Sequence, residues 1–173
     1  MCSGSVDLAN DCESGNNYMK PIKLFVMDVD GTLTDGKIYV TANGETFKAF
    51  DVKDGYGIRH ILKSYGIKTA IITGRESGIV QCRAKELGVD FVFQGVQDKV
   101  ECLEMLLRQL GYGWTEVAYV GDDVNDLECI KRVAWSGCPG DAHKSVRRVA
   151  TYVAENSGGH GAVREMIEAA CGI

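Results

Sequence analysis

The apolar residues of this chain gather in short runs, separated by stretches with helical periodicity. Short apolar runs bounded by glycine or polar residues are typical of buried strands. We expect strands at residues 22–27, 67–72, 89–93, 117–120, 133–136 and 151–154. Between them we expect a first helix that ends at residue 65, then helices at residues 77–87, 97–110, 125–132, 142–149 and 162–170. Strands that alternate with helices predict an α/β fold with a doubly wound, Rossmann-like parallel sheet.

One segment interrupts this alternation. Residues 37–50 carry β-branched and aromatic side chains on both sides of Asn43-Gly44, which predicts a β-hairpin. An isolated hairpin is only marginally stable, so we expect it to pack on another surface, with a neighbouring subunit as the candidate. The hairpin lies between the first strand and the first helix, in place of a cap domain, and could act as a small cap over the site. We expect a flexible arm at residues 1–20, rich in Ser, Asn and Gly, and a single domain over residues 21–173.

The composition and charge of the chain argue against some classes of partner. The 173 residues are 45% hydrophobic and 25% charged, as in ordinary globular domains, and the net charge of −5 argues against nucleic acid as a partner. No apolar run approaches the roughly 18 residues of a membrane helix, so we expect no membrane partner. The first twenty residues lack a signal-peptide core, and the seven cysteines show no Cys-x-x-Cys spacing. We therefore expect reduced thiols and a cytoplasmic location.

The first strand ends in two carboxylates, Asp28 and Asp30. Because a strand alternates its faces, both fall on one side at the carboxyl edge of the sheet, where open parallel sheets bind ligands. Two close carboxylates need a cation or a shared proton, and a divalent metal with a phosphate ester meets that need. One carboxylate can then attack phosphorus while the other carries the proton. The alternative is a turn with two solvated aspartates.

A second acidic cluster follows the strand at residues 117–120. Asp122, Asp123 and Asp126 lie within five positions, and three carboxylates after a buried strand are costly without a cation. Hard oxygen ligands favour Mg²⁺. The alternative is a helix N-terminus whose acids complement the helix dipole.

Several single residues could serve a phosphate ester, and each also has a structural explanation. Thr73 ends a strand and could receive a phosphate oxygen, or it could cap a helix. Lys99, early in its helix, could neutralise phosphate, or it could be a solvated lysine. Arg59, Arg75 and Arg83 could form an anion-binding ring, or each could be an ordinary surface arginine.

Taken in order, these motifs resemble those of the haloacid dehalogenase-like (HAD) phosphatases over about residues 20–170. Within that superfamily the chain is most similar to the 3-deoxy-D-manno-octulosonate 8-phosphate (KDO 8-phosphate) phosphatases of lipopolysaccharide-sugar synthesis. The absence of a large inserted cap fits the same subfamily. The segments that carry the resemblance are residues 30–36, 43–45, 48–50, 54–58, 72–75, 93–95, 117–123 and 161–165.

The resemblance implies a magnesium-dependent phosphatase that acts on a phosphorylated sugar acid through an aspartyl-phosphate intermediate. Asp28 would be the nucleophile and Asp30 the general acid/base, with Thr73 and Lys99 holding the phosphoryl group. The metal would be held by the carboxylates of Asp28 and Asp122 and by the backbone carbonyl of Asp30. Residues that would meet the substrate are Asp51, Val52, Lys53, Asp54, Gly55, Arg59, Arg75, Arg83 and Lys99. Family members form homotetramers in which hairpins pack together and chain tails reach a neighbour's site.

The chain departs from the family pattern at two places. The family tail commonly reads Gly-Gly-Arg-Gly, whereas this chain has His160 in place of the arginine, so a tail contact by arginine is not expected here. Residues 136–140 also differ from the small apolar stretch that is usual before Asp141.

Three other interpretations stay open on sequence. A phosphatase of a nine-carbon sialic-type sugar phosphate (KDN or N-acylneuraminate 9-phosphate) would look similar but often carries Glu at the position of Arg75. A non-catalytic tetramerisation domain, as found fused to CMP-sialic acid synthetases, usually lacks motif acids that are present here. A phospho-accepting receiver places its aspartate on a middle strand, whereas Asp28 and Asp30 open this fold.

Overall fold

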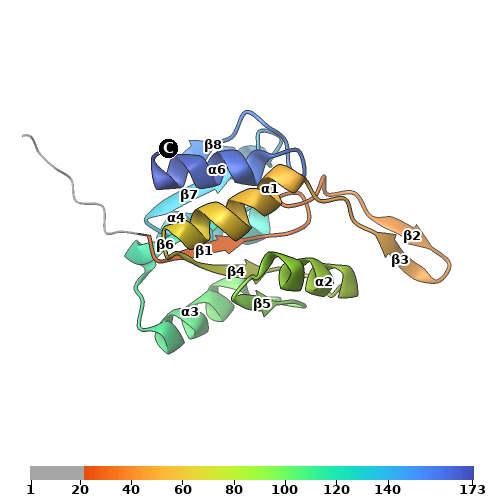
Figure 1. Cartoon of the computed structure of the whole chain (residues 1–173), viewed down its shortest axis with the longest axis horizontal. Helices are drawn as coiled ribbons and strands as arrows, with labels where there is room; N and C mark the ends of the chain where they lie inside the picture. The colour runs from red at the N-terminus through yellow and green to blue at the C-terminus, as the bar shows by residue number, and fades with distance from the viewer. Residues whose placement is uncertain (1–21) are drawn as a thin grey trace, which may run out of the picture.

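The structure, a computed structural model, describes residues 22–173, so the arm predicted for residues 1–20 lies outside the described range. Its centre is a six-stranded parallel sheet in the order β5-β4-β1-β6-β7-β8 (Figure 1). The strands are β1 Leu24–Met27, β4 Lys68–Ile72, β5 Phe91–Phe93, β6 Val117–Val120, β7 Trp135–Cys138 and β8 Tyr152–Val153. The predicted doubly wound α/β sheet is confirmed.

Helices cover both faces of the sheet (Figure 1). One face carries α1 Val52–Tyr56, the π-helix η1 Gly57–Leu62, α2 Gly78–Leu87 and α6 Ala162–Cys171. The other face carries α3 Lys99–Leu110, α4 Leu127–Arg132 and α5 Lys144–Arg147. Two short 3₁₀ turns, η2 Trp114–Glu116 and η3 Val124–Asp126, flank β6. Within residues 22–173, no helix combines the length and apolar character needed to cross a membrane.

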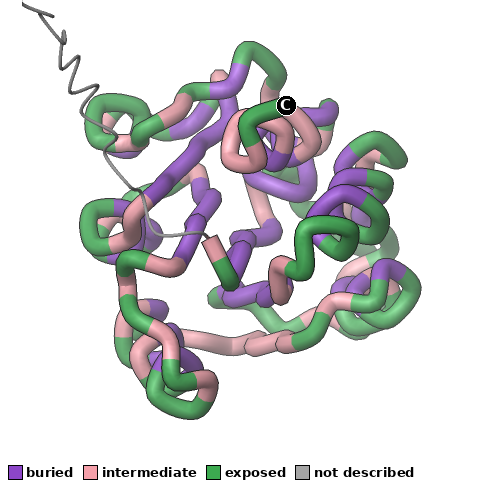
Figure 2. Tube along the Cα trace, turned by 60° about the vertical axis from the view of Figure 1, so that its left-hand side comes forward, coloured by how far each residue is buried: buried purple, intermediate pink, exposed green. Residues whose placement is uncertain are grey.

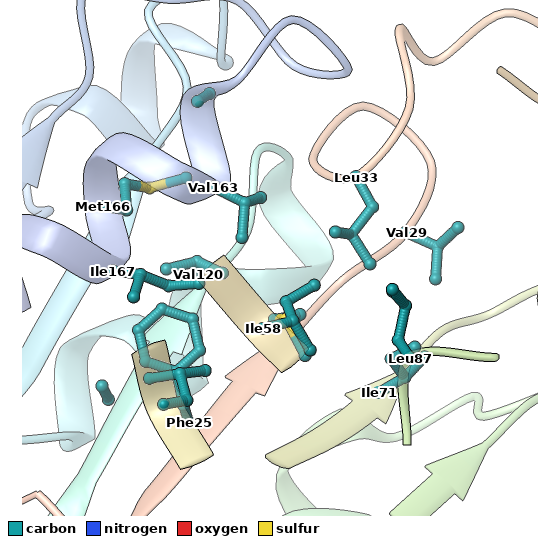
Figure 3. Close-up of a cluster of buried hydrophobic side chains, with 14 of the residues drawn as sticks. Phe25, Val29, Leu33, Ile58, Ile71, Leu87, Val120, Val163, Met166 and Ile167 are labelled. Carbon is teal, nitrogen blue, oxygen red and sulfur yellow. The ribbon is translucent and has the colours of Figure 1, made fainter. Parts of the chain in front are cut away.

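The core consists of two apolar layers, one on each face of the sheet. In β1, Phe25 and Met27 point into the layer beneath α6, while Leu24 and Val26 point into the layer beneath α3. This alternation follows from the period of two along a strand. Figure 3 shows Phe25 packed near side chains of η1 and α6, and Figure 2 shows buried residues concentrated along the central strands. All four β1 residues are therefore buried, which holds the following loop on a rigid base.

Some boundaries differ from those expected from the pattern. The strand expected at residues 133–136 lies instead at Trp135–Cys138, because Val133 still belongs to the end of α4 and donates its N–H to the Cys129 carbonyl. The helix expected to end at residue 65 is divided into a short α-helix and a π-helix. Apolar periodicity does not distinguish these helical forms, because it reports only which face is buried.

The predicted hairpin is present as a separate two-stranded sheet, β2 Tyr39–Thr41 and β3 Gly44–Phe47, and projects from the body (Figure 1). The rings of Tyr39 and Phe47 stack with centroids 4.3 Å apart. Ile38, Val40 and Phe47 are exposed large apolar side chains. The hairpin thus presents apolar surface to its surroundings, as the sequence predicted.

Candidate active site

Three adjacent strands place the predicted site residues together. Asp28 directly follows β1, Thr73 directly follows β4, and Asp122 follows β6 after one glycine. Because β4, β1 and β6 are neighbours and parallel, these three side chains meet at one carboxyl edge. They line a small open pocket of about 140 Å³, whose lining residues are Asp28, Asp30, Thr73, Gly74, Arg75, Asp122, Asp123 and Asn125. Sequence reasoning therefore placed this part of the site at the edge where the structure has it.

Lys99 lies at the centre of the acidic cluster. Its Nζ atom donates to Asp28 Oδ1 at 2.6 Å and to Asp126 Oδ1 at 2.7 Å. Asp98 caps the N-terminus of α3 by accepting from the Glu101 N–H, so Lys99 is the first residue of a helix that is fixed at this end. Lys99 is only 3% exposed, which excludes the solvated lysine that the sequence left open.

Asp126 is a site residue whose role sequence reasoning missed. Its side chain is fully buried, and its Oδ1 atom accepts from Lys99 and from the Tyr119 hydroxyl at 2.7 Å. Its Oδ2 atom accepts from the backbone N–H groups of Asp122 and Asp123. Four donors already use this carboxylate, so we assign it to holding Lys99 and the 121–126 turn rather than to holding a metal. No sequence motif indicated this role of Asp126, because its contact with Tyr119 joins the turn to the strand before it.

The site has an excess of negative charge. Asp28 and Asp126 are buried and Asp122 is half-buried. Within residues 22–173, Lys99 is the one ammonium that forms ion pairs in this group, with Asp28 and with Asp126. Burial raises the pKa of Asp28 to about 8, with Asp126 adding to the rise and Lys99 opposing it. Burial likewise raises the pKa of Asp122 to about 6, although the Thr32 hydrogen bond opposes it. Burial also opposes the charge of Lys99, but its carboxylate partners outweigh this and raise the Lys99 pKa.

The donor set fits a divalent cation. One carboxylate oxygen of Asp28 lies within 4.8 Å of one of Asp122, so these two side chains could bind one ion, while Asp126 holds Lys99 beside them. Thr32 Oγ1 donates to Asp122 Oδ1 at 3.0 Å, which orients that carboxylate. At Gly31 the backbone has φ of +99°, and an added Cβ would lie 2.1 Å from Asp122 Oδ2. Glycine is therefore required at position 31 for both its backbone conformation and the space beside Asp122. The carboxylate oxygens of this site are hard donors, which Mg²⁺ prefers.

Asp30 points to a different set of partners from Asp28. Its carboxylate forms ion pairs with Lys48 and, at 3.7 Å, with Arg75 Nε. Glu45 accepts from the same two cations, at 3.0 Å from Lys48 and 3.4 Å from Arg75. Sequence reasoning included residues 43–45 and 48–50 in the family resemblance but assigned Lys48 and Glu45 no role. The hairpin therefore contributes charged side chains to the site as well as apolar surface.

The other residues expected to meet the substrate lie outside this pocket. Asp51 caps α1 by accepting from the Lys53 N–H at 2.6 Å. Asp54 is buried beneath α6 and accepts from the Arg164 N–H at 2.7 Å, and burial raises its pKa to about 6. Val52, Lys53 and Gly55 belong to the same short helix, with Val52 and Lys53 exposed and Gly55 buried.

The arginine ring expected from the sequence is not formed within the described part of a single chain. Arg75 reaches the acids, but Arg83 pairs with Glu86 at 2.8 Å and lies over the Phe50 ring. Arg59 lines another pocket, near the amino end of β4, and donates to the Glu86 carbonyl at 3.1 Å. Linear order could not separate these arginines, because they come from η1, from the loop after β4 and from α2, whose packing sets the distances between them.

The segment before α6 lies against the loop that follows β1, residues 28–36. An added Cβ at Gly158 would lie 1.9 Å from the Gly31 carbonyl oxygen, so only glycine fits there. The Gly159 N–H donates to the Thr32 carbonyl at 3.2 Å. His160 is exposed, and its effect on a contact with a neighbouring site stays a prediction.

Comparison with known proteins agrees with this geometry. A family model described as haloacid dehalogenase-like hydrolase matches residues 57–133. The 3-deoxy-D-manno-octulosonate 8-phosphate phosphatase of Escherichia coli K12 is 45% identical over 147 residues, which cover 85% of this chain and 78% of that protein.

Two solved structures of proteins with that description are also similar. The phosphatase from Moraxella catarrhalis, in complex with magnesium, phosphate and KDO, has a TM-score of 0.84 at 43% identity and covers 87% of this chain and 86% of its own. The cobalt-bound phosphatase from Haemophilus influenzae has a TM-score of 0.84 at 36% identity, covering 89% and 90%. The chain therefore belongs to the haloacid dehalogenase-like hydrolases and, among these phosphomonoester hydrolases, to the 3-deoxy-D-manno-octulosonate 8-phosphate phosphatase family.

Proposed function

We propose that this protein hydrolyses 3-deoxy-D-manno-octulosonate 8-phosphate to KDO and inorganic phosphate with Mg²⁺, as a step of lipopolysaccharide-sugar synthesis. The observation that carries the proposal is the Asp28–Lys99–Asp122 arrangement at the carboxyl edge of a family member. The nine-carbon alternative is less favoured, because Arg75 lines the pocket where relatives of that kind often carry Glu. The non-catalytic alternative is disfavoured by the complete set of acids.

The reaction divides into two displacements at phosphorus. A carboxylate oxygen of Asp28 attacks phosphorus and the bond to the sugar oxygen breaks, while Asp30 gives its proton to that departing oxygen. Asp30, now a carboxylate, takes a proton from water, and the water oxygen displaces Asp28 to release phosphate. Thr73 and Lys99 hold the phosphoryl oxygens. Asp28, Asp122 and the backbone carbonyl of Asp30 would hold Mg²⁺, which would supply positive charge to neutralise the phosphoryl group when bound.

The first expected result is that phosphate release from KDO 8-phosphate requires a divalent metal. Excess EDTA should abolish phosphate release and added Mg²⁺ should restore it. The reason is that the carboxylates of Asp28, Asp122 and Asp126 carry more negative charge than the Lys99 ammonium balances. A malachite-green assay on KDO 8-phosphate and on N-acylneuraminate 9-phosphate measures both metal need and substrate choice. Full activity in EDTA, or faster release from the nine-carbon ester, would contradict the proposal.

Assembly as a homotetramer is a second part of the proposal. Val40 is 62% exposed and Ile38 is 40% exposed on the hairpin, and the family resemblance implies that hairpins pack together. We expect Ile38→Ser with Val40→Ser to reduce the mass measured by light scattering, because burying each such side chain is worth roughly 1.5–3 kcal/mol. These two positions leave the Tyr39–Phe47 stack intact.

The matched control is Val149→Ser, since Val149 is also an exposed apolar residue but lies outside the hairpin. It should leave the mass unchanged. A wild-type protein that is monomeric at micromolar concentration, or a hairpin variant that keeps the wild-type mass, would rule out assembly through this surface.

A cytoplasmic location completes the proposal. Cys102, Cys129 and Cys138 are free thiols buried in the described part of the chain, as is usual in a reducing compartment. Cell fractionation with an antibody against the protein would check the location.

A further inference from the structure

Asp30 stands in a four-charge cluster built from three separate segments. The loop after β1 supplies Asp30, the hairpin segment of residues 37–50 supplies Glu45 and Lys48, and the loop after β4 supplies Arg75. Ser77 also donates its hydroxyl to Glu45. When Asp30 is ionised, two carboxylates meet two cations and the cluster is neutral. When Asp30 holds the proton that it gives to the leaving oxygen, the cluster carries one net positive charge.

The two cations differ in how firmly they hold Asp30. The Lys48 side chain is 1% exposed and pairs directly with Asp30, whereas Arg75 is 46% exposed and its Nε atom lies 3.7 Å away. Removing a lysine from water is expensive unless its partners are fixed, so Lys48 is held in place by Asp30 and Glu45 together. Lys48 is therefore the cation that fixes Asp30, and Arg75 is the more accessible of the two.

We propose that Lys48, braced by Glu45, is a positioning residue that orients Asp30 for proton transfer to the leaving sugar oxygen. The inference rests on the proposed function, because it assigns Asp30 the proton-carrying role. Lys48 does not line the pocket of Asp28, so it acts through Asp30 and not on the phosphoryl group. The hairpin thereby has a chemical task in addition to its apolar surface.

The test compares two esters that need different amounts of help at the leaving oxygen. General acid catalysis is worth roughly 10²–10⁴-fold, and a positioning residue supplies part of that. We expect Lys48→Met to lower kcat on the sugar phosphate by about 10–100-fold and on p-nitrophenyl phosphate by no more than about 3-fold. The KM for the sugar phosphate should change little.

A double-mutant cycle shows whether Lys48 acts through Asp30. In an Asp30→Asn background, Lys48→Met should cause no further loss of kcat, because the group that it positions is already gone. If the two losses multiply, Lys48 has a separate role and the inference is wrong. An equal loss on both esters in the single variant, or a rise in KM alone, would overturn it as well.

Two further variants separate positioning from folding. Glu45→Gln keeps the size of the side chain that contacts Lys48 and leaves the Lys48–Asp30 pair in place. It should lower kcat less than Lys48→Met does, and again more on the sugar phosphate than on the aryl ester. Lys37→Met is the matched control, because Lys37 is also near the hairpin but is exposed and pairs with Asp35 at 3.3 Å. It should behave as wild type on both esters.

The outcomes distinguish this inference from the proposed function. Wild-type protein that releases no phosphate from KDO 8-phosphate but does so from other alkyl esters would contradict the proposed substrate, while the Lys48 comparison could still be made on those esters. Conversely, full wild-type activity on KDO 8-phosphate with a Lys48→Met variant that loses nothing would refute the positioning role alone. A Glu45→Gln variant that loses equally on both esters would also refute it.

Discussion

Replacing Asp28 by Asn should abolish phosphate release from every ester, including aryl esters with good leaving groups. The amide keeps the shape of the side chain but removes the attacking carboxylate, so no phospho-enzyme can form. Asp28 is buried and paired with Lys99 at 2.6 Å, which fixes the direction of that oxygen. The measurement is steady-state release from KDO 8-phosphate and p-nitrophenyl phosphate, down to the detection limit.

Asp30→Asn is the informative comparison for that result. Loss of general acid–base catalysis should cost roughly 10²–10⁴-fold on the sugar phosphate and less on the aryl ester, whose leaving oxygen needs little protonation. Hydrolysis of the phospho-enzyme would still be slowed, so a burst of p-nitrophenol is expected. If Asp28→Asn keeps activity on the aryl ester while Asp30→Asn is equally inactive on both, the two roles have been assigned wrongly.

Lys99→Met should cause the largest combined loss of stability and activity. The substitution leaves Asp28 and Asp126 buried without their cation, and breaking a buried ion pair in this way costs about 3–5 kcal/mol. At roughly 2–4 °C per kcal/mol for a domain of this size, the melting temperature should fall by about 6–20 °C. Activity should fall by on the order of 10²–10³-fold, because a phosphoryl-binding donor is lost.

Lys131→Met provides the matched control. Lys131 also pairs with an acid, Glu128 at 2.7 Å, but both side chains are exposed, so the pair is worth at most about 1 kcal/mol. Thermal melts should be recorded in EDTA and in Mg²⁺. Mg²⁺ beside Asp28 and Asp122 should recover part of the stability that the Lys99 variant loses. It should stabilise the control as much as it stabilises the wild type, because the control keeps both of these carboxylates. Equal falls in melting temperature for the Lys99→Met and Lys131→Met variants would show that the buried Lys99 ion pairs do not stabilise the protein more than an exposed pair does.

The order and type of the elements could be predicted from the sequence because burial is periodic. Strands buried on both faces appear as continuous apolar runs, and six of them alternate with helical patterns to define the doubly wound sheet. The same logic placed Asp28, Thr73 and Asp122 together, since parallel strands bring their carboxyl ends to one edge. The hairpin followed from local turn chemistry at Asn43-Gly44.

Contacts between segments far apart in the chain could be decided only by the tertiary structure. Asp126 of the 121–126 turn holds Lys99 of α3 and also accepts from the Tyr119 hydroxyl of β6, and no residue spacing encodes the meeting of Lys99 with Asp126. Lys48, directly after β3, meets Asp30 where the chain returns from the hairpin to the body, whereas Arg59 lies near the other end of β4. Periodicity specifies which face of an element is buried, but long-range packing specifies which charged groups become partners, and that pairing decides the chemistry of this site.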